Sequence, residues 1–388
     1  MSIVQDLLVA ARRYRQVRSS PSPLAACEAE RESLRDWFRR SFAALPSAAP
    51  FRGASLVELE SSQPPWADTG LDLDEGEWVT TCAAGRVVLS LPLDLWVGPQ
   101  FQLWMRIGED GRVFNGTRDT FSFRAAASGR LYLAGCLPGQ WAEPNGRLAT
   151  SIDDYAAAKG GLTVAVFRWA GDAREGMAAL ASRGEGTGRL DDELVRLAAD
   201  VREPPGWNYL WFVGRSEIFQ PAEADGRFCI SCHTHRSAGI LQHDALLDFQ
   251  PGTRLGWDWN VAALPSTLPE NSALSHDYLS VAVEFENGRD ITYTWSRELP
   301  VEYGYWCPLP TWKDREFHVV VRSGEAGLGT WIHEERDLYA DYRRYLGEPP
   351  RRVVRVWLIA ASVFQRLEGR ALFRDFRLEG PGGRVSIG

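Results

Sequence analysis

Residues 254–261 read RLGWDWNV, and large apolar side chains alternate with polar ones along most of this stretch. Successive side chains of a β-strand point to opposite sides of the sheet, so the pattern predicts a strand with two unlike faces. The apolar face carries Leu255, Trp257, Trp259 and Val261. The polar face carries Asp258 and Asn260. An apolar face of this size predicts burial against a second sheet, as in a β-sandwich.

Two further stretches, 278–286 and 315–322, alternate in the same way. Their apolar positions add to the predicted core. Their polar positions include Glu284, Glu316, His318 and Arg322. We expect these side chains and Asp258 to share the outer face of one sheet, beside aromatic residues that line a cleft.

The rest of the chain indicates a mainly β fold. Apolar residues recur at helical spacing over 3–18 and 24–45, and short alternating strands separated by Gly, Asp and Asn turns fill 55–170. We therefore predict two jelly-roll-like β-sandwich domains with an N-terminal helical hairpin and a short helical connector. The predicted boundaries are 1–48 for the hairpin, 49–171 for the first sandwich, 172–203 for the connector and 204–388 for the second sandwich.

Several motifs of the second sandwich form a recognisable set. They are LGWDWNV at 255–261, HDY at 276–278 before the 281–285 strand, and TYTWS at 292–296. With these motifs, the region from about 205 to 380 resembles a bacterial family known only as a domain of unknown function. The resemblance implies a jelly-roll sandwich and no particular activity.

The first sandwich carries WADTGLDL at 66–73, LWMRIG at 103–108 and ASGRLYL at 127–133. In these motifs it resembles the calcium-dependent galactose-binding lectins of the LecA type. That resemblance implies a sandwich in which a loop before the last strand holds calcium and sugar. The matching stretch is 141–161, where Asp153 and Asp154 would supply oxygen ligands to calcium. The alternative is a solvated loop on a structural domain.

The strongest acid–base candidates are Glu284, Glu316 and His318. General acid–base catalysis needs a group whose pKa lies near the working pH, which a histidine or a desolvated glutamate can provide. Arg322 would stabilise developing negative charge. The alternative is that the carboxylates are solvated charges paired with Arg322. Cys307 is a further candidate nucleophile, but nothing in the sequence supplies its base.

A ligand would be held by aromatic and polar side chains near these strands. The predicted substrate-binding residues are Trp257, Asp258, Trp259, His276, Tyr278, Tyr293, Trp295 and Trp331. The chain has 16 tryptophans, and tryptophan offers a large, flat and amphipathic surface. For these tryptophans the alternative is a place in the core.

Charge and motifs exclude several classes of protein. A net charge of −8 argues against binding to nucleic acid or to an anionic membrane surface, and no apolar run is long enough to span a bilayer. The CxxCH motif at 229–233 offers donors for zinc, but the donors lie too close in sequence to close a tetrahedron readily. We therefore expect no organic cofactor and no zinc, with calcium as the candidate ion of the first sandwich.

Two hypotheses of function remain. The first is a cytoplasmic enzyme, a lyase, cyclase or hydrolase, that binds a glycosylated, terpenoid or aromatic small molecule in a Trp-lined cleft and acts by acid–base chemistry. The alternative is a non-catalytic carbohydrate-binding protein. In either case the N-terminal helices could form a homodimer contact.

Overall fold

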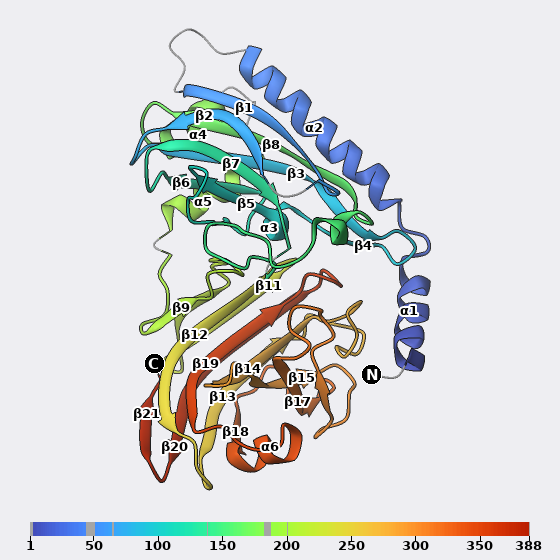
Figure 1. Ribbon diagram of the computed structural model, residues 1–388, viewed down its shortest axis with the longest axis vertical. Helices are drawn as coiled ribbons and strands as arrows, with labels where there is room; N and C mark the ends of the chain where they lie inside the picture. Colours follow the sequence, from blue (N-terminus) through green and yellow to red (C-terminus); the bar gives the residue numbers. More distant parts are fainter. Residues whose placement is uncertain are drawn as a thin grey trace. The chain divides into compact units, whose positions relative to one another are not determined.

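A computed structural model describes residues 3–43, 51–63, 66–137, 139–181, 188–199 and 201–387. The chain divides into two units, which are described separately (Figure 1). One unit spans Gln16–Val201, and the other combines Met1–Arg15 with Arg202–Gly388. None of the described helices is long and apolar enough to cross a membrane. The prediction of a mainly β protein with sandwich domains is confirmed, because both units consist of paired sheets.

The N-terminal unit contains a five-stranded and a three-stranded sheet. The larger sheet consists of β1 (Phe51–Glu60), β8 (Lys159–Trp169), β3 (Trp78–Ser90), β4 (Leu95–Val97) and β6 (Thr120–Arg124). The smaller consists of β2 (Ala67–Leu73), β7 (Gly129–Gly135) and β5 (Leu103–Ile107). Its helices are α2 (Pro23–Ala43), α3 (Pro99–Gln102), α4 (Ala173–Ala181), α5 (Asp191–Ala198) and a 3₁₀ turn (Ile152–Tyr155). Apolar residues of both sheets form the core between them.

Helix α2 packs on the outer face of the five-stranded sheet, together with α4 and α5. Its apolar stripe is buried through Leu34 and Trp37, and Trp37 meets the ring of Phe167 edge-on at 5.6 Å. Beside the stripe, Arg31 and Arg35 bind the carboxylate of Glu58 on β1 at 2.8 and 2.9 Å. The helix is therefore held by an apolar contact and by an ion-pair network.

This network predicts an acid-sensitive attachment of α2. Burial raises the pKa of Glu58, but hydrogen bonds from Arg35, Thr163 and Arg31 outweigh burial and lower it overall. A lowered carboxyl pKa stabilises the folded state above the ordinary value of 4.5, and this stabilisation is lost as pH falls through the folded value. The protection factors of the α2 amides, which correct for the slower intrinsic exchange in acid, should fall on acidification in the wild type and much less in Glu58→Gln. If acidification changed the protection of α2 equally in Glu58→Gln and in the exposed control Glu75→Gln, the role of the Glu58 ion pairs would be contradicted.

The C-terminal unit is a larger sandwich. One sheet has six strands: β10 (Phe219–Ala224), β11 (Arg227–His235), β20 (Glu368–Gly380), β13 (Arg254–Ala263), β18 (Ile332–Asp337) and β21 (Gly383–Ser386). The other has seven: β16 (Gly304–Trp306), β17 (Glu316–Ser323), β15 (Asp290–Ser296), β14 (Tyr278–Phe285), β19 (Arg352–Ala361), β12 (Ala238–Asp248) and β9 (Trp207–Tyr209). Helix α6 (Leu338–Tyr345) follows β18 and packs against the core.

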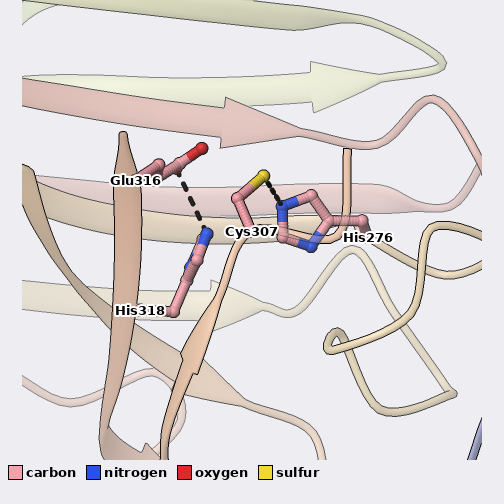
Figure 2. Close-up of side chains that lie close together, drawn as sticks. All are labelled: His276, Cys307, Glu316 and His318. Carbon is pink, nitrogen blue, oxygen red and sulfur yellow. Dashed lines mark hydrogen bonds and ion pairs between the residues drawn. The ribbon is translucent and has the colours of Figure 1, made fainter. Parts of the chain in front are cut away.

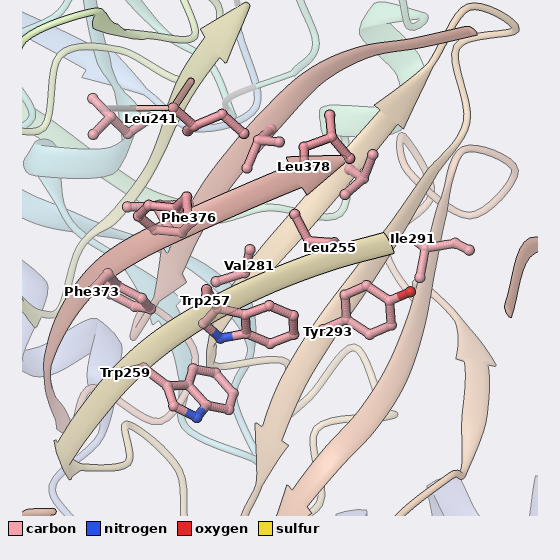
Figure 3. Close-up of a cluster of buried hydrophobic side chains, with 14 of the residues drawn as sticks. Leu241, Leu255, Trp257, Trp259, Val281, Ile291, Tyr293, Phe373, Phe376 and Leu378 are labelled. Atoms are coloured by element: carbon pink, nitrogen blue, oxygen red, sulfur yellow. The ribbon is translucent and has the colours of Figure 1, made fainter. Parts of the chain in front are cut away.

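The core between these two sheets is rich in aromatic residues (Figure 3). Trp257 and Trp259 project into it from β13, and Tyr293 and Trp295 from β15, each at most 1% exposed. The prediction that these four residues line a ligand cleft is wrong. Their faces are turned to the opposite sheet, as the alternation along 254–261 indicated, and no ligand can reach them.

The two N-terminal helices do not form the expected hairpin. Most of α1 (Ile3–Val17) belongs to the C-terminal unit, whereas α2 belongs to the N-terminal unit. The guanidinium of Arg13 is buried and donates hydrogen bonds to the carbonyl oxygens of Leu274 and Phe364 at 2.9 and 2.7 Å. Arg12 forms an ion pair with Glu298. These contacts anchor α1 on the C-terminal sandwich, while α2 buries its stripe elsewhere.

Candidate functional site

Four potential metal-binding or catalytic side chains converge on the outer face of the seven-stranded sheet (Figure 2). Glu316 and His318 stand two residues apart on β17 and therefore point to the same side. Cys307 directly follows β16, which pairs with β17, and His276 lies in the loop before β14. Together they form what we call the His–Cys–Glu cluster: His276, Cys307, Glu316 and His318.

The cluster is tightly connected. The Sγ of Cys307 lies 3.3 Å from Nε2 of His276, and Nε2 of His318 lies 3.3 Å from Oε1 of Glu316. Tyr278 donates a hydrogen bond to the same carboxylate oxygen at 2.7 Å. The ring of Tyr305 stacks on His318 at 4.8 Å. The predicted site residues Glu316, His318, His276 and Tyr278 are thus brought to one place, whereas Glu284 and Arg322 are not.

The His–Cys–Glu cluster is buried, with exposures from 0% to 4%. Burial opposes ionisation of Glu316, but the imidazoles of His318 and His276 outweigh burial and lower its pKa to about 2. Burial and the charge of His318 lower the pKa of His276 to about 3. Burial and the carboxylate of Glu316 raise the pKa of the Cys307 thiol. A Cys–His nucleophile needs an accessible thiolate, which this environment disfavours.

Loops cover the outer face that the sequence analysis expected to be an open cleft. Leu210 and Val213 from one loop and Trp312 from another pack on the sheet beside Cys307, and together they form a second apolar layer. The cluster therefore has no open approach among the described residues. Acid–base catalysis by Glu316 and His318 would require these loops to move.

Glu284 and Arg322 lie apart from the cluster. Glu284 forms an ion pair with Arg355 at 2.7 Å, further along the same face. Arg322 is turned to the other side of the sheet by a β-bulge: Thr294 pairs with Val320 but Trp295 pairs with Arg322, so Val321 is an extra residue. The guanidinium instead binds Glu334 of β18 at 2.6 Å. The grouping of Arg322 with His318 is therefore wrong.

Asp258 belongs to the other sheet, and Trp331 directly precedes its strand β18. Asp258 lies on the outer face of the six-stranded sheet and contacts His333 at 2.7 Å. Trp331 donates a hydrogen bond to Asp225 at 3.0 Å, and the guanidinium of Arg374 lies 3.7 Å from the centre of its ring. The sandwich core thus separates this polar, aromatic surface from the His–Cys–Glu cluster, and the single site predicted from sequence is two surfaces.

A pocket opens where the six-stranded sheet is interrupted. Strand β11 pairs with β20 as far as Phe373, and β21 pairs with it from Arg377 onward. Between these points β20 bulges, with Asp375 at a positive φ of 57°. The gap exposes a cavity of about 530 Å³, which we call the β20 pocket. Its lining is Trp207, Arg227, Phe228, Ile230, Phe373, Arg374, Asp375, Phe376, Arg377, Arg384, Ser386 and Ile387.

The β20 pocket combines apolar rings with hydrogen-bond donors. Phe228 is 47% exposed. Trp207 Nε1 is buried and has no hydrogen-bond partner in the described part of the chain. Arg374 Nε also lacks a hydrogen bond there, but it forms ion pairs with Asp258 and Asp375 at 3.8 and 3.7 Å. Buried donors are normally paired, so Trp207 Nε1 can serve a ligand that supplies an acceptor. Sequence reasoning missed this pocket because a bulge and an unpaired strand edge create it.

The N-terminal unit has a hollow of its own, of about 450 Å³, lined by Trp66, Arg106 and residues 145–152. The ring of Trp66 already stacks on Trp141 at 5.4 Å, and the Arg106 guanidinium lies 4.2 Å from its centre. Asp153 and Asp154 are exposed on the neighbouring 3₁₀ turn. Neither belongs to a metal-ligating group within the described residues, so calcium binding there stays a prediction.

The CxxCH motif lies on β11 and is split between its faces. Cys232 points into the core with Ile230, whereas Cys229 and the exposed His233 occupy the other side. His233 contacts Glu368 at 2.6 Å. Two cysteines three residues apart on a regular strand cannot bind one ion. The donors suited to a metal are instead the four remote residues of the His–Cys–Glu cluster.

A known protein family matches part of the C-terminal region. Residues 205–377 match the family described as "Protein of unknown function (DUF3047)". This match covers less than half of the chain, and it confirms the predicted resemblance of the C-terminal region to a family of unknown function. A comparison with curated proteins finds no match.

Among solved structures, the chain is similar to several lectin and carbohydrate-binding domains. The EclA N-terminal domain, described as a PllA-like lectin, is 18% identical with a TM-score of 0.22, over 29% of this chain and 95% of that one. TmCBM61 in complex with β-1,4-galactotriose is 10% identical with a TM-score of 0.24, over 45% and 88%. A family 11 carbohydrate-binding module from Clostridium thermocellum is 10% identical with a TM-score of 0.22, over 46% and 84%.

Proposed function

We propose that the protein binds carbohydrate through the β20 pocket and does so without catalysis. The observation that carries this proposal is the composition of the pocket, in which the exposed ring of Phe228 lies beside the unpaired Trp207 Nε1 and exposed arginines. A sugar has an apolar ring face and a rim of hydroxyl oxygens, and both are matched when an aromatic ring adjoins polar side chains. A cavity of about 530 Å³ has room for one or two sugar rings.

The charge of the pocket favours an acidic sugar. Four arginines line it, namely Arg227, Arg374, Arg377 and Arg384, against a single carboxylate, Asp375. Arg227 is paired with Asp375 at 2.5 Å, and Arg374 lies 3.6–3.8 Å from the carboxylates of Asp225, Asp258 and Asp375. Arg377 and Arg384 are exposed, and no ion pair is described for either within residues 201–387. Arginine recognises carboxylates through two parallel hydrogen bonds, so the preferred ligand is a saccharide that contains a uronic acid.

The arrangement of the other candidate residues also favours binding over catalysis. The acid–base residues Glu316 and His318 lie beneath loops on the opposite side of the core from the β20 pocket. A sugar held in this pocket therefore cannot contact them. Within the pocket a single carboxylate, Asp375, is present, whereas glycoside hydrolysis ordinarily uses a pair.

The proposal is tested by removing the exposed ring. Phe228→Ala should weaken binding of an oligouronate about tenfold, because loss of one stacking surface costs about 1.4 kcal/mol. Isothermal titration calorimetry measures the affinity, and Leu246→Ala is a control that removes an exposed apolar side chain from β12 outside the pocket. Unchanged affinity in Phe228→Ala, or no binding of the wild type to any acidic or neutral saccharide on a glycan array, would refute the assignment.

A further inference from the structure

We propose that His276, Cys307, Glu316 and His318 bind one zinc ion in a closed tetrahedral site. This site is separate from the proposed carbohydrate pocket and does not depend on it. The donor set is one thiolate, two imidazoles and one carboxylate, which are the ligands that zinc takes in proteins. The four residues come from three regions of the chain, so their convergence is a property of the fold.

The distances already approach a coordination sphere. One ligand atom from each residue lies within 4.8 Å of the other three. Ligands about 2.1 Å from a tetrahedral ion are about 3.4 Å apart. The Cys307–His276 and His318–Glu316 separations are both 3.3 Å. Small side-chain shifts would complete the tetrahedron.

The bonding of His318 also indicates a missing partner. This imidazole is 0% exposed, and neither Nδ1 nor Nε2 has a hydrogen-bond partner among the described residues. Its approach to Glu316 is an ionic contact without hydrogen-bond geometry. A buried imidazole without any hydrogen bond is costly, and a metal bond through Nε2 would satisfy one of its two nitrogens.

The surrounding groups orient the donors for an ion. His276 Nδ1 lies 2.6 Å from the carbonyl oxygen of Glu270; if it donates there, Nε2 is left with a lone pair that faces Cys307. Tyr278 holds the carboxylate of Glu316. Hydrogen bonds of this kind fix the tautomer and the orientation of metal ligands.

Charge balance supports a divalent ion. Binding deprotonates the Cys307 thiol, whose proton passes to solvent, and forms a thiolate–zinc bond. The thiolate and the Glu316 carboxylate together neutralise Zn²⁺, while both imidazoles bind in the neutral form. Four protein ligands leave no position for substrate water, so the role is structural. The ion would join β16, β17 and the loop before β14.

The first test uses the wild-type protein. Purified protein should contain about one zinc per chain by inductively coupled plasma mass spectrometry. After removal of zinc, cobalt(II) should bind and give the visible bands of a tetrahedral ion with a thiolate-to-cobalt charge-transfer band. A chain that neither retains zinc nor shows the charge-transfer band overturns the proposal, as does an octahedral cobalt spectrum.

The second test separates this site from the other thiols. Cys307→Ser should lose the bound zinc and the charge-transfer band. Cys229→Ser is the matched control, because it also replaces a buried thiol but lies outside the cluster. Equal zinc content in the two variants overturns the assignment. If Cys307→Ser does not fold, His318→Gln removes one proposed ligand instead. Its cobalt spectrum must then differ from that of the wild type.

Discussion

Replacement of Trp257 by alanine is expected to lower the free energy of unfolding of the C-terminal unit by about 3–5 kcal/mol, as for other large buried aromatic residues. Trp257 is fully buried. Its ring stacks on Tyr293 at 5.6 Å and meets Trp259 edge-on at 5.7 Å. Alanine would leave a cavity between the two sheets. The surrounding side chains could fill this cavity only if both sheets moved.

The matched variant is Trp257→Phe. Trp257 Nε1 has no hydrogen-bond partner in the described part of the chain, so phenylalanine removes no bond and keeps part of the stacking. We therefore expect a clearly smaller loss. Urea unfolding curves of the wild type and both variants measure the difference. If Trp257→Ala unfolded at the wild-type urea concentration but no longer bound a saccharide, Trp257 would be a cleft residue after all.

The contrast between Trp257 and Asp258 shows how far the sequence determines this fold. Alternation along β13 predicted correctly which side chains enter the core, because the period of two is a local property of a strand. It could not predict which strands share a sheet. β13 pairs with β18 and β20, whereas β14 pairs with β15 and β19. The polar faces that were expected to form one cleft therefore lie on opposite outer surfaces of the sandwich.

Arg322 illustrates a second limit. Glu316, His318 and Arg322 are separated by even numbers of positions, so a regular strand would place all three side chains on the same face. A single extra residue at Val321 reverses the orientation of the side chains after it. No glycine or proline marks this bulge, and only the pairing of β15 with β17 reveals it.

The candidate metal site was predictable in part. Glu316 and His318 were paired correctly because they share a strand, and His276 and Tyr278 were singled out as candidates. The sequence also indicated Cys307 as a candidate nucleophile but gave no partner for it. Its neighbour in space, His276, is 31 positions away in the chain. Burial of the whole group depends on loops, whose course has no periodic signature.

The loop before β14, which carries both Glu270 and His276, leads to the second prediction. Glu270→Ala should destabilise the C-terminal unit by about 3 kcal/mol or more. Glu270 is 1% exposed, and its carboxylate accepts hydrogen bonds from the hydroxyls of Ser266 and Ser296 and from the backbone N–H of Arg297. Hydrogen bonds to a charged group contribute about 1.5–3 kcal/mol each, and alanine would remove the acceptor of two buried hydroxyls and of one part-buried N–H. Glu270→Gln keeps the shape and one acceptor, so it should cost less.

The same substitution should also weaken zinc binding, because the backbone carbonyl of Glu270 orients His276. Loosening this loop is expected to reduce zinc affinity about tenfold, the lower end for groups that position a metal ligand. Competition with a chromophoric chelator measures the affinity at a temperature where the variant stays folded, and urea unfolding measures the stability. A variant that loses stability but binds zinc as tightly as the wild type would show that the loop anchors the fold without positioning His276. A variant with unchanged stability would contradict the prediction, because it would show that the three hydrogen bonds of Glu270 do not stabilise the fold.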